Sequence, residues 1–87
     1  MSKQTDGRTR LGRFLRNKVL QGKLLRDKSV TIRGIKLRII KNDYDEYEVQ
    51  WIEDGVINRE KTYYTDDYLD AIATRRQMAI EIIRGVK

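Results

Sequence analysis

The residues of this chain that can do chemistry are mostly positively charged, and they gather near the amino end. Thirteen of the nineteen arginines and lysines lie within the first 41 residues, where only Asp6 and Asp27 oppose them. This part therefore carries a net charge of +11, whereas residues 42–87, with six basic and eleven acidic residues, carry −5. A basic segment joined to a mildly acidic remainder is typical of a protein that binds a polyanion.

Eight of these charges fall within 21 residues and predict contacts with nucleic-acid phosphates. Each phosphate that a basic side chain neutralises on duplex DNA releases counterions, which adds about 0.9 to the slope of log affinity against log salt. The expected phosphate-binding residues in this segment are Arg8, Arg10, Arg13, Arg16, Lys18, Lys23, Arg26 and Lys28. Interleaved Leu and Phe residues leave other ligands open, namely an anionic membrane surface or an acidic groove on a protein.

Several kinds of chemistry are excluded by composition. The chain has no cysteine and no histidine, so disulfides, thiolate zinc sites and histidine acid–base catalysis cannot occur. It also lacks a Gly-rich phosphate loop and a nucleophile–base pair. We therefore expect no enzyme, no cofactor and no metal site. No run of residues approaches the ~20 apolar residues of a membrane span and no secretory signal is visible, so we expect a cytoplasmic protein, associated with the nucleoid if it binds DNA.

The amino-terminal segment is the first of the elements that position these charges. Residues 1–10 are polar and are predicted to be disordered, and residues 11–26 are predicted to form one helix. We divide the chain into a basic arm, residues 1–28, which is partly disordered or helical, and a folded domain, residues 29–87. We see no internal repeat in the sequence.

Alternating apolar residues predict three antiparallel strands after the arm. The expected strands cover residues 30–39, 47–52 and 56–64. Gly34 shifts the alternation in the first strand and predicts a bulge or bend there. Asn42-Asp43 predicts a turn and Asp54-Gly55 a hairpin. In the second strand, Tyr47, Val49 and Trp51 are expected to face the core.

A long helix is predicted to follow, from a cap at residues 65–67 to Gly85. Its apolar arc is wider than one sheet needs, and the extra flank, at Ala71, Met78 and Ile82, is expected to cover the N-terminal segment or a second subunit. The resulting order predicts an α+β fold, in which a small three-stranded antiparallel sheet is covered by one C-terminal helix and preceded by the basic segment.

Two arginines interrupt that apolar arc. Arg75 and Arg76 are expected to place their heads in water or to pair with a sheet carboxylate, either Glu48 or Glu60. The alternative is that they contact a phosphate or a partner at the edge between helix and sheet.

Residues 47–78, YEVQWIEDGVINREKTYYTDDYLDAIATRRQM, resemble a known family of DNA-binding domains. They are similar to the three-stranded-sheet-plus-helix domains at the amino ends of phage and transposon integrases, and equally to plant ethylene-response-factor domains. The shared features are the aromatic second strand, the Asp54-Gly55 hairpin, a charged third strand ending in Tyr63-Tyr64 and a Thr-Asp cap. The resemblance extends over residues 35–84 and implies that the exposed sheet face enters the major groove.

On the matching positions, the resemblance implies that Lys36, Arg38 and Gln50 face DNA. The third strand has two possible registers. A two-residue turn at Asp54-Gly55 would place Arg59 and Lys61 beside Gln50 and Glu48, whereas a longer loop would turn them toward the helix. Arg33 completes the set of expected nucleic-acid-binding residues. Glu48 departs from the pattern, since a carboxylate repels phosphate, although it could pair with Lys61.

The leading interpretation is a small accessory or regulatory protein that binds nucleic acid, with duplex DNA favoured over RNA. The arm would contact phosphates and form one surface with the first strand at Lys36 and Arg38, and the sheet face would lie toward the groove. Such proteins are often found in phage and mobile elements. The alternative is a protein-interaction or inhibitor module whose basic segment docks on an acidic protein surface. Self-association through the last helix is a further expectation.

Overall fold

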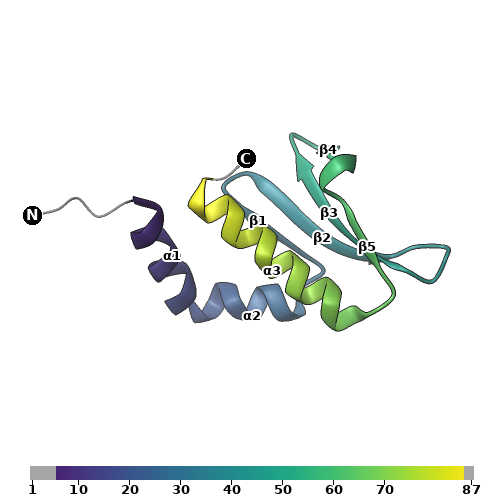
Figure 1. Ribbon diagram of the computed structural model, residues 1–87, viewed down its shortest axis with the longest axis horizontal. Coiled ribbons are helices and arrows are strands. Elements are labelled where there is room, and N and C mark those ends of the chain that lie inside the picture. Colours follow the sequence, from purple (N-terminus) through teal and green to yellow (C-terminus); the bar gives the residue numbers. More distant parts are fainter. Residues whose placement is uncertain (1–5, 86–87) are drawn as a thin grey trace, which may run out of the picture.

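The computed structural model describes residues 6–85, with side chains from residue 11 onward. In this range the chain forms an antiparallel sheet and three α-helices, which confirms the predicted α+β class (Figure 1). The helices are α1 (Asp6–Arg16), α2 (Lys18–Arg26) and α3 (Tyr68–Arg84). The strands are β1 (Ser29–Ile32), β2 (Ile35–Lys41), β3 (Tyr47–Glu53), β4 (Val56–Ile57) and β5 (Tyr63–Thr65), with a 3-10 turn, η1 (Arg59–Lys61), between the last two.

The sheet has the order β1-β2-β3-β4, and β5 pairs with the other end of β3. One face packs against α3. On that face Leu37 lies opposite Trp51, and both are buried together with Val49. This confirms the prediction that the second strand turns Val49 and Trp51 toward the core, with Tyr47 half-buried at its start.

The first predicted strand is in fact a hairpin. Arg33 and Gly34 both have positive φ angles, 52° and 82°, and Ile32 pairs directly with Ile35. Two residues with positive φ form the tight turn whose twist suits antiparallel strands. The predicted bend at Gly34 is therefore wrong, because the chain reverses there and adds a strand at the edge. The other predicted hairpin, at Asp54-Gly55, is confirmed, with φ angles of 52° and 78°.

The third predicted strand is interrupted. Ile57 pairs with Ile52 and Tyr63 pairs with Val49, so residues 58–62 lie opposite only two residues of β3. The Asn58 side chain holds this excursion, because its Oδ1 accepts hydrogen bonds from the backbone N–H groups of residues 60 and 61 at 3.1 and 3.2 Å. A continuous strand over residues 56–64 was a wrong prediction, because a short polar side chain that binds nearby backbone favours a turn.

The basic segment forms two helices in place of the predicted single one. Asn17 separates them, and its Oδ1 caps α2 by accepting a hydrogen bond from the N–H of Leu20 at 3.0 Å. Residues 6–10, for which disorder was predicted, begin α1, and residues 1–5 lie outside the described part. Phe14 and Leu24 are 3% and 1% exposed and join the main core. Both helices pack against α3 and meet at a corner beside it (Figure 1).

The wide apolar arc of α3 therefore has two partners within the chain. Asp67 caps the helix by accepting from the N–H of Leu69 at 3.0 Å, and Gly85, with φ 80°, ends it as predicted. On one flank Met78 and Ile82 line cavities together with Trp51. On the other, Ile83 lies with Phe14 and Leu20. The flank expected to cover the N-terminal segment thus faces the sheet, and Ile83, on the opposite flank, lies beside that segment.

Candidate nucleic-acid interface

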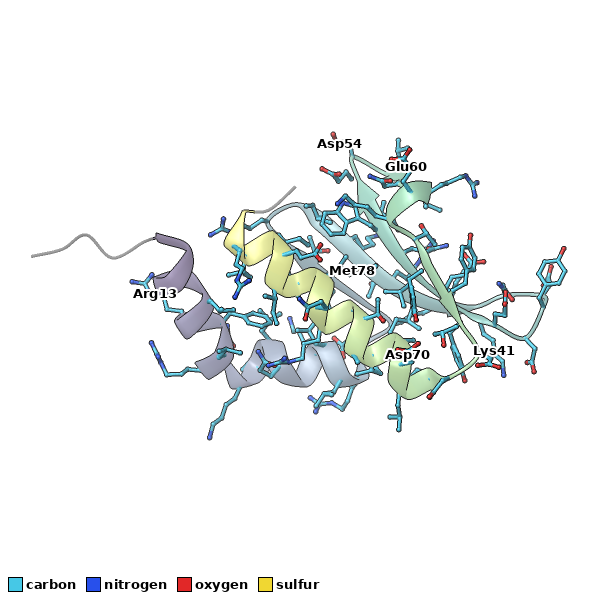
Figure 2. The ribbon with its side chains drawn as sticks, viewed as in Figure 1. Arg13, Lys41, Asp54, Glu60, Asp70 and Met78 are labelled. Atoms are coloured by element: carbon cyan, nitrogen blue, oxygen red, sulfur yellow. The ribbon has the colours of Figure 1, made fainter. Side chains whose placement is uncertain are left out.

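The expected phosphate-binding residues of the N-terminal segment are presented by α1, α2 and the residue that precedes β1. The exposed members are Arg13, Arg16, Lys18, Lys23, Arg26 and Lys28. Figure 2 shows Arg13 on the outer side of α1, away from α3. Arg8 and Arg10 belong to the first turns of α1, but their side chains lie outside the described part. We call the six exposed residues, together with Arg33, the basic helix surface.

Arg33 joins this surface through the β1–β2 turn. Its side chain is exposed and lines a cavity that Arg13, Phe14 and Ile83 also line. The turn therefore brings the first sheet hairpin next to α1, which the sequence, read as one bent strand, did not predict.

Among residues whose side chains the structure describes, no carboxylate forms an ion pair with the basic helix surface. Asp27 is the single carboxylate among residues 11–28. In the described part of the chain, the one ion pair joins Lys41 to Asp45, with 3.0 Å between Nζ and Oδ1, in the β2–β3 hairpin. That contact raises the pKa of Lys41, through the hydrogen bond first and the charge of Asp45 second. The basic helix surface therefore carries a net positive charge.

Arg75 fixes the end of α2 to α3. Its side chain is completely buried. Its Nη2 donates to the carbonyl oxygens of Leu24 at 2.6 Å and Lys23 at 3.3 Å, and its Nη1 donates to that of Lys28 at 3.1 Å. Free carbonyl groups at a helix C-terminus carry partial negative charge and stabilise a cation. Burial lowers the pKa of Arg75, with smaller opposing effects from Tyr68 and Asp27.

The neighbouring arginine fixes the end of α1 through one intermediary. Arg76 Nε donates to Gln21 Oε1 at 3.2 Å, and Gln21 Nε2 donates to the carbonyl oxygen of Phe14 at 2.9 Å. The predicted pairing of the two arginines with sheet carboxylates is therefore wrong. Their position inside an apolar arc was the signal that they have buried partners, but the partners are backbone and amide oxygens that charge patterns do not reveal.

On the open face of the sheet, the side chains expected to read bases bind each other. Arg38 Nε donates to Gln50 Oε1 at 2.9 Å, and Gln50 Nε2 donates to Glu48 Oε1 at 3.1 Å. Asn42 Nδ2 also donates to Glu48 Oε2 at 3.1 Å, so four side chains are linked by hydrogen bonds. Gln50 is only 4% exposed. Of the residues that the resemblance assigns to strands β2 and β3, Lys36 alone is exposed.

The remaining two expected residues, Arg59 and Lys61, lie in η1, outside the sheet. The turn at Asp54-Gly55 has two residues, yet Arg59 and Lys61 do not stand beside Gln50 and Glu48, because the strand breaks after Ile57. Arg59 is exposed in η1. Lys61 turns to the α3 side, where its Nζ lies 4.5 Å from the centre of the Trp51 ring, so the pairing of Lys61 with Glu48 is also wrong.

The two basic groups do not share one face. Lys36 and Arg38 alternate with Leu37 and Ile39, whose side chains are buried on the side of α3, so they point to the opposite side of the sheet. The helices α1 and α2 pack against α3. The surface predicted to run from the arm into the first strand therefore reaches Arg33 but stops short of Lys36 and Arg38.

No family model, curated protein or solved structure matches the chain. Among residues 6–85, no cluster of three or more carboxylates could hold a metal ion. No helix in that range is long and apolar enough to cross a membrane.

Proposed function

We propose that this protein binds nucleic acid by placing the basic helix surface against phosphates. The observation that carries the proposal is that five exposed cations on helices docked by Phe14, Leu24 and Arg75, and Lys28 directly after them, have no ion pair in the described part of the chain. Because these helices are already packed, a ligand does not have to order them on binding, which favours affinity. Release of counterions from the phosphates supplies the driving force.

The contacts proposed here position a protein on a duplex without reading its sequence. The sheet face adds little direct reading, because both amide atoms of Gln50 are hydrogen-bonded within the protein. We therefore propose an accessory or regulatory protein with weak sequence preference. Duplex DNA is favoured over RNA on the strength of the resemblance to sheet-and-helix DNA-binding domains.

The test is fluorescence anisotropy with labelled duplex DNA and duplex RNA at several salt concentrations. The variant replaces Arg13, Arg16, Lys18, Lys23, Arg26 and Lys28 with Gln. If all six contact phosphates, the slope of log affinity against log salt falls by about 5 on DNA. The Lys36→Gln variant is the control, with a slope that changes by at most about 1. A wild-type protein that binds neither polymer at about 50 mM salt contradicts the proposal.

A second candidate, a module that docks on an acidic protein surface, is favoured by one observation. Leu15, Val19 and Leu25 stand exposed among the basic residues at 49%, 71% and 56%, and apolar groups contribute to protein grooves more than to phosphate contacts. Binding of the wild-type protein to duplex DNA separates the candidates, and replacing these three with Ser tests whether the apolar side chains take part. A phosphate-binding protein keeps its affinity for DNA after this change, whereas an acidic-surface module has no affinity for either polymer to begin with.

A further inference from the structure

Two segments of the basic helix surface, ten residues apart, are repeats of one another. Residues 11–18 read LGRFLRNK and residues 21–28 read QGKLLRDK. Four of the eight positions are identical and three more keep the same chemical character, so that only Leu11 and Gln21 differ in kind. The conclusion that the sequence contains no internal repeat was therefore wrong. We call residues 11–18 the first repeat and residues 21–28 the second repeat.

The repeats also have the same structure. All eight matched positions agree in whether the residue is buried, half-buried or exposed, and in each repeat the fourth residue, Phe14 or Leu24, is the buried one. Each helix ends at the sixth residue, Arg16 or Arg26. Each repeat therefore turns one apolar side chain inward and directs three basic side chains into solvent.

The terminal arginine is placed alike in both repeats. Each guanidinium folds back over the glycine one turn earlier in the helix. A Cβ on Gly12 would lie 3.5 Å from Nη1 of Arg16, and one on Gly22 would lie 2.9 Å from Nη2 of Arg26. The glycine therefore leaves space for the guanidinium beside the helix, and this space is tighter in the second repeat.

In both repeats the carbonyl oxygen of the fourth residue accepts a hydrogen bond from a side chain outside its own helix. The carbonyl oxygen of Phe14 accepts from Gln21, and the matching oxygen of Leu24 accepts from Arg75. Because Gln21 is held in turn by Arg76, two consecutive residues of α3 fix the two repeats. Duplicated units held in matched ways suit a ligand that itself repeats, as a phosphate backbone does.

We propose that the two repeats are equivalent phosphate-binding units that contact neighbouring stretches of backbone on one duplex. This inference rests on the proposed function. The basic residues of the units are Arg13, Arg16 and Lys18 in the first repeat and Lys23, Arg26 and Lys28 in the second. Arg16 and Arg26 are separated by one linker residue and helix α2 of nine residues, a span of roughly 15 Å at about 1.5 Å per residue. A duplex carries one charge per about 1.7 Å, so this span covers about nine phosphate charges.

The test compares two matched variants by the same anisotropy titration on duplex DNA. One variant carries Arg13→Gln, Arg16→Gln and Lys18→Gln, and the other carries Lys23→Gln, Arg26→Gln and Lys28→Gln. Each is expected to lower the salt slope by the same amount, about 2.7, and the six-residue variant by the sum. The control, Lys41→Gln with Arg59→Gln and Lys61→Gln, removes as many charges outside the repeats and is expected to leave the slope nearly unchanged.

The outcomes separate this inference from the function on which it rests. If the wild-type protein binds duplex DNA but one variant loses the slope while the other keeps it, the repeats are not equivalent and the inference is wrong, whereas the proposed function stands. If neither variant changes the slope, the basic helix surface does not contact phosphates, and the proposed function is wrong together with this inference. If the wild-type protein does not bind, both proposals are wrong. Circular dichroism of each variant, and recovery of the slope with Arg16→Lys and Arg26→Lys in place of Gln, distinguishes lost charge from lost structure.

Discussion

The N-terminal helices and the open face of the sheet both carry basic side chains, but these differ in what they touch. On the helices, the side chains of Arg13, Arg16 and their neighbours are exposed, and the described part of the chain offers them no ion pair. On the sheet, Arg38 donates to Gln50, which is bound to Glu48. The difference shows that a basic residue is available to a ligand only where the fold leaves it without an internal partner.

The largest expected effect comes from removing the side chains that anchor the two basic helices on α3. Phe14→Ala and Leu24→Ala each remove a buried side chain, and such changes cost about 3–5 and 2–5 kcal/mol respectively. Because the anchors hold the two basic helices on α3, both variants are also expected to lose DNA affinity. Urea unfolding followed by circular dichroism gives the free energy of unfolding. Exposed Leu15→Ala is the control and is expected to change it by about 0.5 kcal/mol or less. A similar small change for Phe14→Ala would mean that α1 is not docked.

A somewhat smaller effect is expected at the buried arginine. Arg75→Met keeps most of the side-chain bulk but removes three hydrogen bonds to backbone carbonyl groups, and we expect a loss of about 2–4 kcal/mol in the free energy of unfolding. Arg76→Met removes a single half-buried hydrogen bond and is expected to cost about 1 kcal/mol. Equal effects of the two variants in urea unfolding would show that Arg75 does not fix α2.

The sequence predicted the fold class and much of the core because those depend on local patterns. The alternation of Val49 and Trp51, the Asp54-Gly55 turn and the Gly85 stop each follow from the conformational preferences of a few adjacent residues. The Arg33-Gly34 hairpin was missed because Arg is an unusual residue at positive φ, so the reversal looked like a bend. The break at Asn58 was missed because its cause is a side chain that binds its own backbone.

The candidate site was only partly predictable for a different reason. The positions of the charged residues can be counted in the sequence, but their partners are set by tertiary contacts. Arg75 binds carbonyl groups about fifty residues away, and the buried Gln50 is hydrogen-bonded to Arg38 on the neighbouring strand. Neither contact leaves a pattern in the chain. The repeat of residues 11–18 in residues 21–28 was missed in the sequence, and the matched burial of Phe14 and Leu24 makes it evident.

Two variants on strand β2 test the role of the open face of the sheet. Arg38→Ala leaves the buried Gln50 oxygen without its donor, so the free energy of unfolding is expected to fall by about 1–2 kcal/mol. Lys36→Ala, at an exposed position, is expected to change it by about 0.5 kcal/mol or less. Because Lys36 and Arg38 point away from the basic helix surface, anisotropy should show at most a small loss of affinity for either variant, of the same size for every duplex sequence. A loss confined to one sequence on Arg38→Ala would instead identify Arg38 as a base-reading residue.

The smallest expected effect concerns the contact between β5 and α3, apart from both basic groups. Tyr63 Oη donates to Asp70 Oδ2 at 2.8 Å, and this hydrogen bond, followed by the charge of Asp70, raises the pKa of Tyr63. Because the folded pKa lies above the unfolded one, the stabilisation is complete below the unfolded pKa of about 10 and is lost as pH rises through the folded pKa. The wild-type protein should therefore lose more stability than Tyr63→Phe between pH values of about 8 and 11 in urea unfolding. Equal losses would mean that this hydrogen bond does not contribute to folding. DNA affinity at neutral pH should be the same for both proteins, because Tyr63 lies outside the basic helix surface and the open sheet face.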